Sequence, residues 1–193
     1  GDRAARALYF FPTKALAQDQ SRTLDALIPP KSRTRHGIFD GDTPTEDRAD
    51  IRRNAQIVLT NPDMLHVGIL PNHRGWYRLL RGLRFVVIDE LHAYRGVFGS
   101  HLANILRRLR RVCAHYGSSP VFICSSATIA NPRELAERLT SDRFALGERN
   151  RAPRGEKFFA LVNPPVVNPQ LGIRRSYVAE TRRLAVEFLR RRL

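Results

Sequence analysis

The stretch Phe85-Val86-Val87-Ile88-Asp89-Glu90-Leu91-His92 joins a short apolar run to two adjacent carboxylates and a histidine. A short apolar run of this kind indicates a buried strand, and buried strands rarely end in two acids without a cation to meet them. Open α/β sheets place their ligands beyond the carboxyl ends of the strands. One carboxylate can hold Mg²⁺ there while its neighbour orients an attacking water, so the stretch points towards nucleotide hydrolysis.

Length and charge set the outer limits. The chain has 193 residues, enough for one domain, or one and a part, with a hydrophobic core. Its 33 Lys and Arg residues outnumber 18 Asp and Glu residues, for a net charge of +15. Such an excess favours a polyanionic partner, most simply nucleic acid. Solvated arginine-rich helix faces would also account for part of it, and the even spread of arginines does not locate a site.

Cysteine usage and hydropathy favour a cytoplasmic protein. Cys113 and Cys124 are the only cysteines, and both fall on expected core faces, which fits a reducing compartment and argues against a structural metal site. The longest unbroken apolar runs have five residues, so the sequence predicts no membrane span, and no signal-peptide pattern opens the chain.

Apolar strands alternate with amphipathic helices along the chain. The expected N-caps are Thr45, Asn61 and Asn131, with Pro62 at the first position of its helix. The predicted strands are 7–11, 36–39, 56–59, 85–88 and 120–124, and the predicted helices are 13–28, 46–53, 62–69, 100–116 and 132–139. This alternation predicts an α/β fold, with a parallel sheet and helices on both faces.

The composition changes near residue 140. Residues 141–155 are polar and arginine-rich, and a further strand (158–162), a proline-punctuated loop (163–169) and a helix (176–193) follow. A lone strand and helix cannot bury an apolar stripe by themselves. They either pack on the first domain or open a second one. We therefore expect a first domain over 1–150, and a linker with the beginning of a second domain over 151–193.

Five motifs in chain order resemble those of superfamily 2 helicases. They are Phe11-Pro12-Thr13-Lys14-Ala15-Leu16-Ala17-Gln18-Asp19-Gln20 (motif Ia), Asp40-Gly41-Asp42-Thr43 (motif Ib), Thr60-Asn61-Pro62-Asp63-Met64-Leu65 (a further nucleic-acid-binding motif), Asp89-Glu90-Leu91-His92 (a DExH motif II) and Ser125-Ser126-Ala127-Thr128 (motif III). Residues 94–101 (YRGVFGSH) and 126–132 (SATIANP) are specifically similar to the YprA-like branch of DExH helicases.

The resemblance implies a RecA-like P-loop NTPase fold that uses ATP and Mg²⁺. Within it, Asp89 would hold Mg²⁺ and Glu90 would be the general base for the water that attacks the γ-phosphate. His92, Ser126 and Thr128 would couple the nucleotide site to the nucleic-acid face. Two acids that cap the following turn and face arginines such as Arg95 are the structural alternative.

The resemblance also assigns a set of residues to the grip on one nucleic-acid strand, with DNA favoured over RNA and DNA repair as the expected role. The set is Pro12, Thr13, Lys14, Gly41, Asp42, Thr60 and Asn61. They lie at tight turns or where a strand delivers the chain to a helix N-terminus, whose free N–H groups bind phosphate. Such contacts hold a backbone without reading its sequence. Plain helix capping is the alternative for each corner taken alone.

The sequence contains no Gly-x-x-x-x-Gly-Lys-Ser/Thr loop, which in the resembling helicases precedes motif Ia. We therefore expect an N-terminally truncated motor domain: part of an ATP-dependent DNA helicase or translocase, with negligible ATPase activity in this segment alone. A non-catalytic module that binds single-stranded nucleic acid remains the alternative. An unrelated Mg²⁺-dependent phosphohydrolase is disfavoured, because it would leave Thr13-Lys14, Thr60-Asn61-Pro62 and Ser126-Ala127-Thr128 unexplained.

Two further features have ordinary structural explanations at this stage. Helix 100–116 carries Arg107, Arg108, Arg110 and Arg111 on its non-apolar side, which favours a solvated face over a surface that tracks DNA. Trp76 and Tyr77 are expected to pack their helix onto the sheet.

Overall fold

The computed structural model describes residues 5–147, 155–156 and 161–191. The chain divides into two compact units, Gly1–Glu148 and Arg149–Leu193. The division falls two residues before the boundary expected from composition. Each unit is described by itself.

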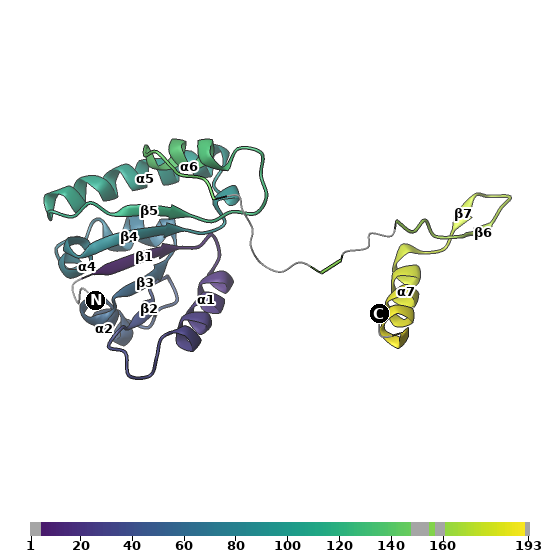
Figure 1. Ribbon diagram of the computed structural model, residues 1–193, viewed down its shortest axis with the longest axis horizontal. Coiled ribbons are helices and arrows are strands. Elements are labelled where there is room, and N and C mark those ends of the chain that lie inside the picture. The colour runs from purple at the N-terminus through teal and green to yellow at the C-terminus, as the bar shows by residue number, and fades with distance from the viewer. Residues whose placement is uncertain (1–4, 148–154, 157–160, 192–193) are drawn as a thin grey trace. The chain divides into compact units, whose positions relative to one another are not determined.

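The first unit is built on a five-stranded parallel sheet (Figure 1). Its strands, in the spatial order β2-β3-β1-β4-β5, are β1 (Arg6–Phe10), β2 (His36–Ile38), β3 (Ile57–Thr60), β4 (Leu83–Ile88) and β5 (Val121–Cys124). All four pairings are parallel, so the carboxyl ends of the strands share one edge. The predicted α/β class and parallel sheet are confirmed.

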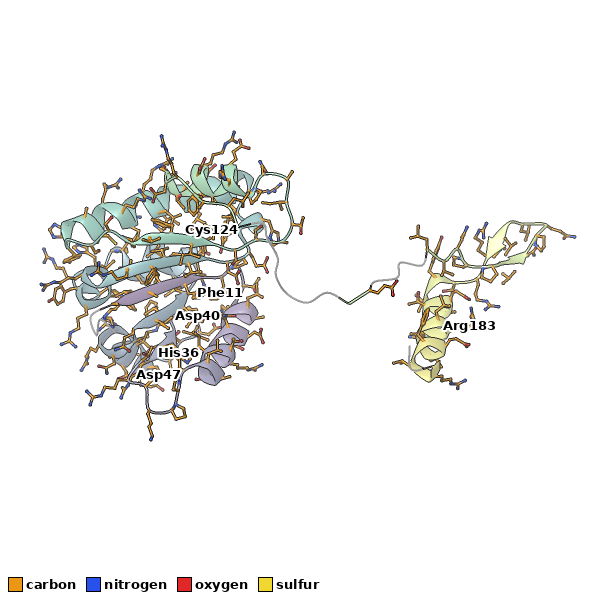
Figure 2. The ribbon with its side chains drawn as sticks, in the orientation of Figure 1. Phe11, His36, Asp40, Asp47, Cys124 and Arg183 are labelled. Carbon is orange, nitrogen blue, oxygen red and sulfur yellow. The ribbon has the colours of Figure 1, made fainter. Side chains whose placement is uncertain are left out.

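Helices lie on both faces of this sheet, as predicted. They are α1 (Lys14–Leu27), α2 (Thr45–Asn54), α3 (Pro62–Met64), the π-helix η1 (Leu65–Ile69), α4 (Tyr77–Arg81), the 3₁₀ turn η2 (Leu91–Ala93), α5 (Gly96–His115) and α6 (Pro132–Thr140). A small cluster of Phe11, Ala17 and Leu59 joins α1 to one face (Figure 2). The larger core on the other face takes buried leucines from α4, α5 and α6.

The beginnings of α2 and α5 and the capping of α6 differ from expectation. Helix α2 starts at Thr45 itself, with Pro44 at the N-cap and no side-chain cap, so the assignment of Thr45 as a cap is wrong. Asn131 does occupy the N-cap of α6, but its amide donates to Glu134 (3.0 Å) and caps no backbone group. Helix α5 begins at Gly96, four residues early, and its first turn packs so closely that a Cβ on Gly99 would lie 2.5 Å from the Tyr94 carbonyl oxygen.

The segment predicted as one helix over 62–69 is α-helical only in its first turn. Asn61 caps it as expected, because its Oδ1 accepts a hydrogen bond from the Met64 amide (2.8 Å). From Leu65 the hydrogen bonding widens, and the Leu70 amide donates to the Leu65 carbonyl (2.9 Å), five residues back. Short π-helical turns of this kind are frequent at functional sites.

The aromatic pair at the start of α4 divides between core and surface. Trp76 is 1 % exposed and meets the Phe39 ring edge-on, with ring centroids 4.6 Å apart, which confirms its predicted packing. Tyr77 is 43 % exposed, so its predicted packing on the sheet is wrong. Buried Leu79 and Leu80 hold the inner side of α4, and position 77 turns outwards.

On the sheet face that carries α1, the side chains of β4 and β5 are partly exposed to solvent. Phe85, Val121 and Ile123 are 45 %, 58 % and 46 % exposed. The strand register aligns Phe85 with Val121 across the sheet. This half of the face therefore presents an apolar surface to solvent.

The second unit contains an antiparallel pair, β6 (Val166–Asn168) and β7 (Ile173–Arg174), and helix α7 (Tyr177–Arg191). The predicted loop over 163–169 therefore holds a short strand. Most of the predicted strand 158–162 lies outside the described residues, and Leu161 and Val162 are not in a strand. Buried Glu180 pairs with Arg175 (3.0 Å) and Arg183 (2.7 Å; Figure 2).

None of the helices in the described ranges combines the length and apolar character that a membrane crossing requires.

Candidate functional site

The carboxyl edge of the sheet brings together motifs that are far apart in sequence. Hydrogen bonds continue the strand pairing beyond the strand ends: the Asp89 amide donates to the Phe10 carbonyl (3.0 Å) and the Leu91 amide to the Ser125 carbonyl (2.9 Å). The Phe11 amide likewise donates to the Thr60 carbonyl (3.1 Å). Motifs Ia, II and III and the Thr60 segment therefore meet at one rigid edge, where ligands of such sheets bind.

Asp89 is half-buried and keeps one carboxylate oxygen available. Its Oδ1 accepts hydrogen bonds from the Ser125 hydroxyl and from the Glu90 amide (3.0 Å). No donor to Oδ2 is found among the described residues. A carboxylate oriented through one oxygen, with the other free, fits a ligand of a hard divalent cation.

Among the described residues, the carboxylate pair has no arginine or lysine partner. Within the described part of the chain, neither Asp89 nor Glu90 forms an ion pair with a guanidinium or an ammonium group, and Arg95 forms no hydrogen bond or ion pair with them. The alternative in which the two acids face arginines such as Arg95 therefore has no support. Two adjacent carboxylates without a fixed counter-charge favour binding of a cation.

Glu90 has a left-handed backbone, with φ 51° and ψ 46°. This conformation ends β4 and starts η2, whose Ala93 amide donates to the Glu90 carbonyl (2.8 Å). A non-glycine residue in this region costs about 1–2 kcal/mol. Strain of this sort clusters at functional sites, where it fixes the direction of a side chain.

His92 lies between motif II and motif III. Its Nδ1 is 3.1 Å from Glu90 Oε2 and 3.4 Å from the Ala127 amide nitrogen, which donates to it. The imidazole thus contacts both the expected general base and the segment expected to respond to it. His92 was predicted to link motif II to motif III, and the structure brings His92, Glu90 and Ala127 together.

Within motif III, Ser125 rather than its neighbours contacts Asp89. Ser126 and Thr128 are exposed, and their hydroxyls form no hydrogen bond to another described residue. Both line a cavity of about 520 Å³ together with Leu91 and Arg133. Ser125 was not among the predicted site residues, although its place as the first residue after β5 was the available signal.

Two tyrosines near the acids remain neutral phenols. Burial, and then the charges of Asp89 and Glu90, raise the pKa of Tyr94. The Tyr94 hydroxyl is buried without a hydrogen-bond partner among the described residues. Burial, and then Asp89, likewise raise the pKa of Tyr9. The negative charge of the site therefore comes from the carboxylates and not from these two tyrosine hydroxyls.

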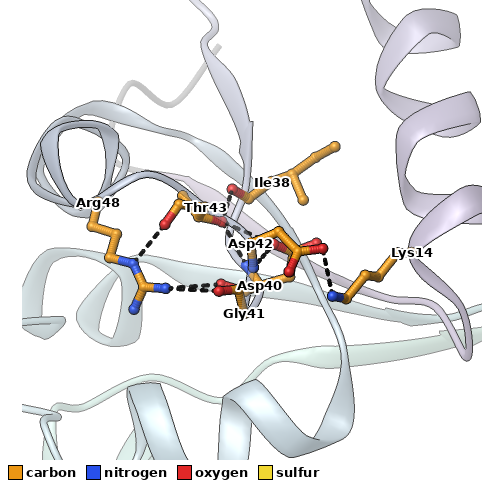
Figure 3. A network of polar contacts seen from close by, with 7 residues as sticks. All are labelled: Lys14, Ile38, Asp40, Gly41, Asp42, Thr43 and Arg48. Atoms are coloured by element: carbon orange, nitrogen blue, oxygen red, sulfur yellow. Dashed lines mark hydrogen bonds and ion pairs between the residues drawn. The ribbon is translucent and has the colours of Figure 1, made fainter.

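Motifs Ia and Ib form two corners joined by an ion pair. Thr13 caps α1, with its hydroxyl accepting from the Leu16 amide (3.4 Å). Lys14 Nζ lies 2.5 Å from Asp42 Oδ2 on the neighbouring turn (Figure 3). Because this bond favours the charged amine, it raises the pKa of Lys14. Pro12 is half-buried at the start of this corner.

The motif Ib turn is held from inside. The Asp42 amide donates to the buried Asp40 carboxylate (2.9 Å), and Arg48 Nε donates to the Thr43 carbonyl (2.9 Å). Arg48 also donates to the Asp40 carbonyl (3.3 Å), so one guanidinium spans the turn (Figure 3). Gly41 lies at the tip of the turn, where a Cβ would meet no atom within 4 Å, and its carbonyl accepts a hydrogen bond from Arg48 (3.4 Å).

The third corner pairs a cap with a buried hydroxyl. Asn61 caps α3, as described above. Thr60 is 1 % exposed, and its hydroxyl donates to the Phe39 carbonyl (2.7 Å). The Thr60 side chain therefore ties the third corner to the second, and Asn61 is the polar side chain at the surface.

The chain is similar to proteins of a known family. The family model described as DEAD/DEAH box helicase matches residues 1–135. The chain is 54% identical over 193 residues to a Bacillus subtilis protein named uncharacterized ATP-dependent helicase YprA, covering all of this chain and 26% of that protein. It is 40% identical over 199 residues to the ATP-dependent helicase hrq1 of Schizosaccharomyces pombe, covering all of this chain and 19% of that protein.

Solved structures match over most of the chain. A crystal structure of the DUF1998 helicase MrfA bound to DNA superposes with a TM-score of 0.92 at 55% identity, covering 97% of this chain and 25% of that one. MrfA bound to DNA and AMPPNP gives a TM-score of 0.90 at 54% identity, with 97% and 26% covered. The fold is therefore RecA-like, and the chain spans about a quarter or less of the length of these relatives.

Proposed function

The chain belongs to the DEAD/DEAH box helicase family, and from that premise we propose that it forms part of an ATP-dependent DNA helicase or translocase. The observation that carries the proposal is the meeting of Asp89, Glu90, His92 and Ser125 at the edge that also carries the three corners. Its relatives named as ATP-dependent helicases, and the DNA in the MrfA crystal structures, support the same reading.

We assign Asp89 to hold Mg²⁺ through its free carboxylate oxygen, since Ser125 and the Glu90 amide fix the other oxygen. When bound, Mg²⁺ would neutralise charge on the phosphates of ATP. Glu90 accepts a proton from the water that attacks the γ-phosphate, and its left-handed backbone sets the direction of its carboxylate. Ser125 positions Asp89 and does not react.

We assign the three corners to the phosphate backbone of a nucleic-acid strand. The α1 N-terminus with Lys14, the Gly41 turn and the Asn61 cap offer backbone amides, a cation and an amide side chain. Such groups bind phosphates without reading bases. DNA is the proposed strand, and DNA repair the proposed role. The cysteines at 113 and 124 are free, and we place this activity in the reducing cytoplasm.

Coupling between the two halves would pass through His92. Its Nδ1 lies within hydrogen-bond distance of both Glu90 and the Ala127 amide, and Ser126 and Thr128 border the adjoining cavity. Movement of the 125–128 segment would therefore alter the surroundings of the general base.

The decisive experiment measures DNA-stimulated ATP hydrolysis by the full-length protein. Glu90→Gln should lower turnover by about 10²–10⁴-fold, the usual contribution of a general base. Glu46→Gln, an exposed acid on α2, is the matched control and should leave turnover unchanged. Turnover that survives Glu90→Gln would refute the assignment of the base.

A second candidate function is a single-strand-binding module without catalysis, because all three corners form within the first unit. Binding of single-stranded DNA that ATP leaves unchanged, together with no ATP hydrolysis in the full-length protein, would favour it.

A further inference from the structure

The sequence around α4 is basic and free of acids. Between residues 64 and 88 there are four arginines and two histidines, but no Asp or Glu. Arg78 and Arg81 lie on the outer side of α4, and Arg74 precedes it; all three are exposed. We use the term α4 face for His73, Arg74, Tyr77, Arg78 and Arg81.

The arginines of the α4 face are not neutralised. Among the described residues, the guanidinium groups of Arg74 and Arg78 form no hydrogen bond or ion pair, and that of Arg81 donates only to the Tyr77 hydroxyl (3.1 Å). Burial, and then the nearby charge of Arg78, lower the pKa of Arg6 at the start of β1. Like charges therefore gather at this end of the sheet.

Contacts between histidines and tyrosines pack one side of the α4 face against the end of α5. His73 Nδ1 lies 2.7 Å from the Tyr116 hydroxyl at the end of α5, and the Tyr77 and Tyr116 rings are 6.1 Å apart. On η1, His66 Nδ1 lies 2.6 Å from Arg108 Nη1. The α4 face thus rests on α5, and exposed Tyr77 presents part of its ring beside the arginines.

The α4 face lies at the opposite end of the sheet from the three corners. Figure 1 shows α4 at the amino ends of the strands, with the last turns of α5 beside it. A strand of about five residues separates the two ends by roughly 17 Å. Along one side, α3 and η1 lead from the Asn61 corner towards α4, and His66 and Arg108 lie on the way.

We propose that the α4 face binds the phosphodiester backbone of the nucleic-acid segment that flanks the part held by the three corners. The inference rests on the proposed nucleic-acid function and extends it. Unpaired guanidinium groups match phosphate geometry and gain affinity by releasing counterions. The contact would add affinity without base preference, because phosphates carry no sequence information.

The test compares DNA lengths on the full-length protein. At a rise of about 3.4 Å per nucleotide, roughly 17 Å corresponds to about five nucleotides beyond those that the corners hold. A short single strand of about six nucleotides would occupy the corners alone. A strand of about 20 nucleotides, or the short strand extended by a duplex, would also reach the α4 face, and these two arms distinguish a single-stranded from a double-stranded occupant.

The variant is Arg74→Gln/Arg78→Gln/Arg81→Gln. It should weaken binding of an extended DNA by at least about tenfold and lower the slope of log K against log salt by about two, but leave the short strand unaffected. The matched control is Arg22→Gln/Arg33→Gln/Arg35→Gln, which removes three equally exposed charges elsewhere on the first unit. It should change the affinity for either DNA less than about twofold.

Protection of the native protein gives a second measurement that needs no variant. Extended DNA should shield Arg74, Arg78 and Arg81 from phenylglyoxal, whereas the short strand should not. The proposal would be overturned if the two triple variants lost equal affinity for extended DNA. It would also be overturned if extended DNA did not protect these arginines from phenylglyoxal. Binding to phosphatidylserine vesicles that the α4 variant loses while it keeps wild-type DNA affinity would likewise overturn it. If no DNA binds at all, the proposed function itself fails.

Discussion

His92 Nδ1 lies 3.1 Å from Glu90 Oε2, and the same nitrogen accepts the Ala127 N–H at 3.4 Å. A bond to the carboxylate requires a proton on Nδ1, whereas a bond from the amide requires its lone pair. The two bonds are therefore mutually exclusive. His92 Nδ1 can therefore form a hydrogen bond with Glu90 or with Ala127 of motif III, but not with both at once.

We expect His92→Asn to reduce the stimulation of ATP hydrolysis by DNA about tenfold, because one hydrogen bond of about 1.4 kcal/mol is lost from the link. The ratio of stimulated to unstimulated turnover is the measurement. His101→Asn, on the exposed surface of α5, is the control. Stimulation at the wild-type ratio in His92→Asn would show that the link lies elsewhere.

Glu90→Gly should separate backbone strain from catalysis. Removing the side chain from a left-handed residue relieves about 1 kcal/mol, so the variant should be more stable to urea by about that amount while ATP turnover is lost. Ser141 has φ 58° at the end of α6 and gives the matched control. Ser141→Gly should gain similar stability and keep full turnover; a less stable Glu90→Gly would contradict the strain assignment.

The Lys14–Asp42 ion pair predicts opposite effects of its two partners. Lys14→Gln should weaken DNA binding, and Asp42→Asn should strengthen it up to about fivefold, since an exposed pair contributes at most about 1 kcal/mol and Asp42 competes with phosphate. Fluorescence anisotropy with a labelled single strand measures both. In the Lys14→Gln/Asp42→Asn double variant, the gain in DNA affinity from Asp42→Asn should vanish. If the gain persists, it does not arise from releasing Lys14.

Asn61 allows its capping and binding roles to be tested apart. Asn61→Ala should cost about 1 kcal/mol of folding stability, because the Met64 amide loses its acceptor. Asn61→Asp keeps an acceptor at the helix N-terminus and should keep stability, but its charge should repel phosphate and weaken DNA binding. If Asn61→Asp binds DNA as well as the wild type, the third corner does not contact the phosphate backbone of the DNA.

The cysteines predict a pH dependence. Burial raises the pKa of the Cys124 thiol to about 12 and also raises that of Cys113. Iodoacetamide should therefore modify the folded protein slowly at pH 8, but react quickly with unfolded thiols of pKa about 8.5. The folded-state pKa is the higher one, so the thiol contribution to stability holds below about pH 8.5 and declines as the pH rises towards 12. Mass spectrometry of alkylated protein across this range is the check, and rapid labelling at pH 8 would contradict it.

The sequence predicted where the strands and the motifs that follow them lie, but not which side chains contact one another at the strand ends. Alternating apolar runs located β1 to β5 within one or two residues, because hydrophobic periodicity reports which segments are buried. Which serine faces Asp89 depends on where β5 ends, and a shift of one residue exchanges the two faces. Ser125 was missed for that reason.

Two other outcomes depended on tertiary packing. Thr60 looked like a surface contact, but the neighbouring strand brings the Phe39 carbonyl to its hydroxyl. Tyr77 looked like a packing residue, but Trp76, Leu79 and Leu80 already fill the inner side of α4. Phe39 lies 21 residues before Thr60, so the local sequence around Thr60 does not indicate this contact.

The π-helical turn Leu65–Ile69 has a consequence for sequence comparison. Its wide hydrogen bond from Leu70 to Leu65 holds one residue more than an α-helical turn would. Removing one residue would restore α-helical spacing and rotate the preceding residues by about 100° relative to the following ones. That rotation would part His66 from Arg108 while leaving a continuous helix. A one-residue gap at this place in an alignment would therefore mark relatives that keep the element but not the contact.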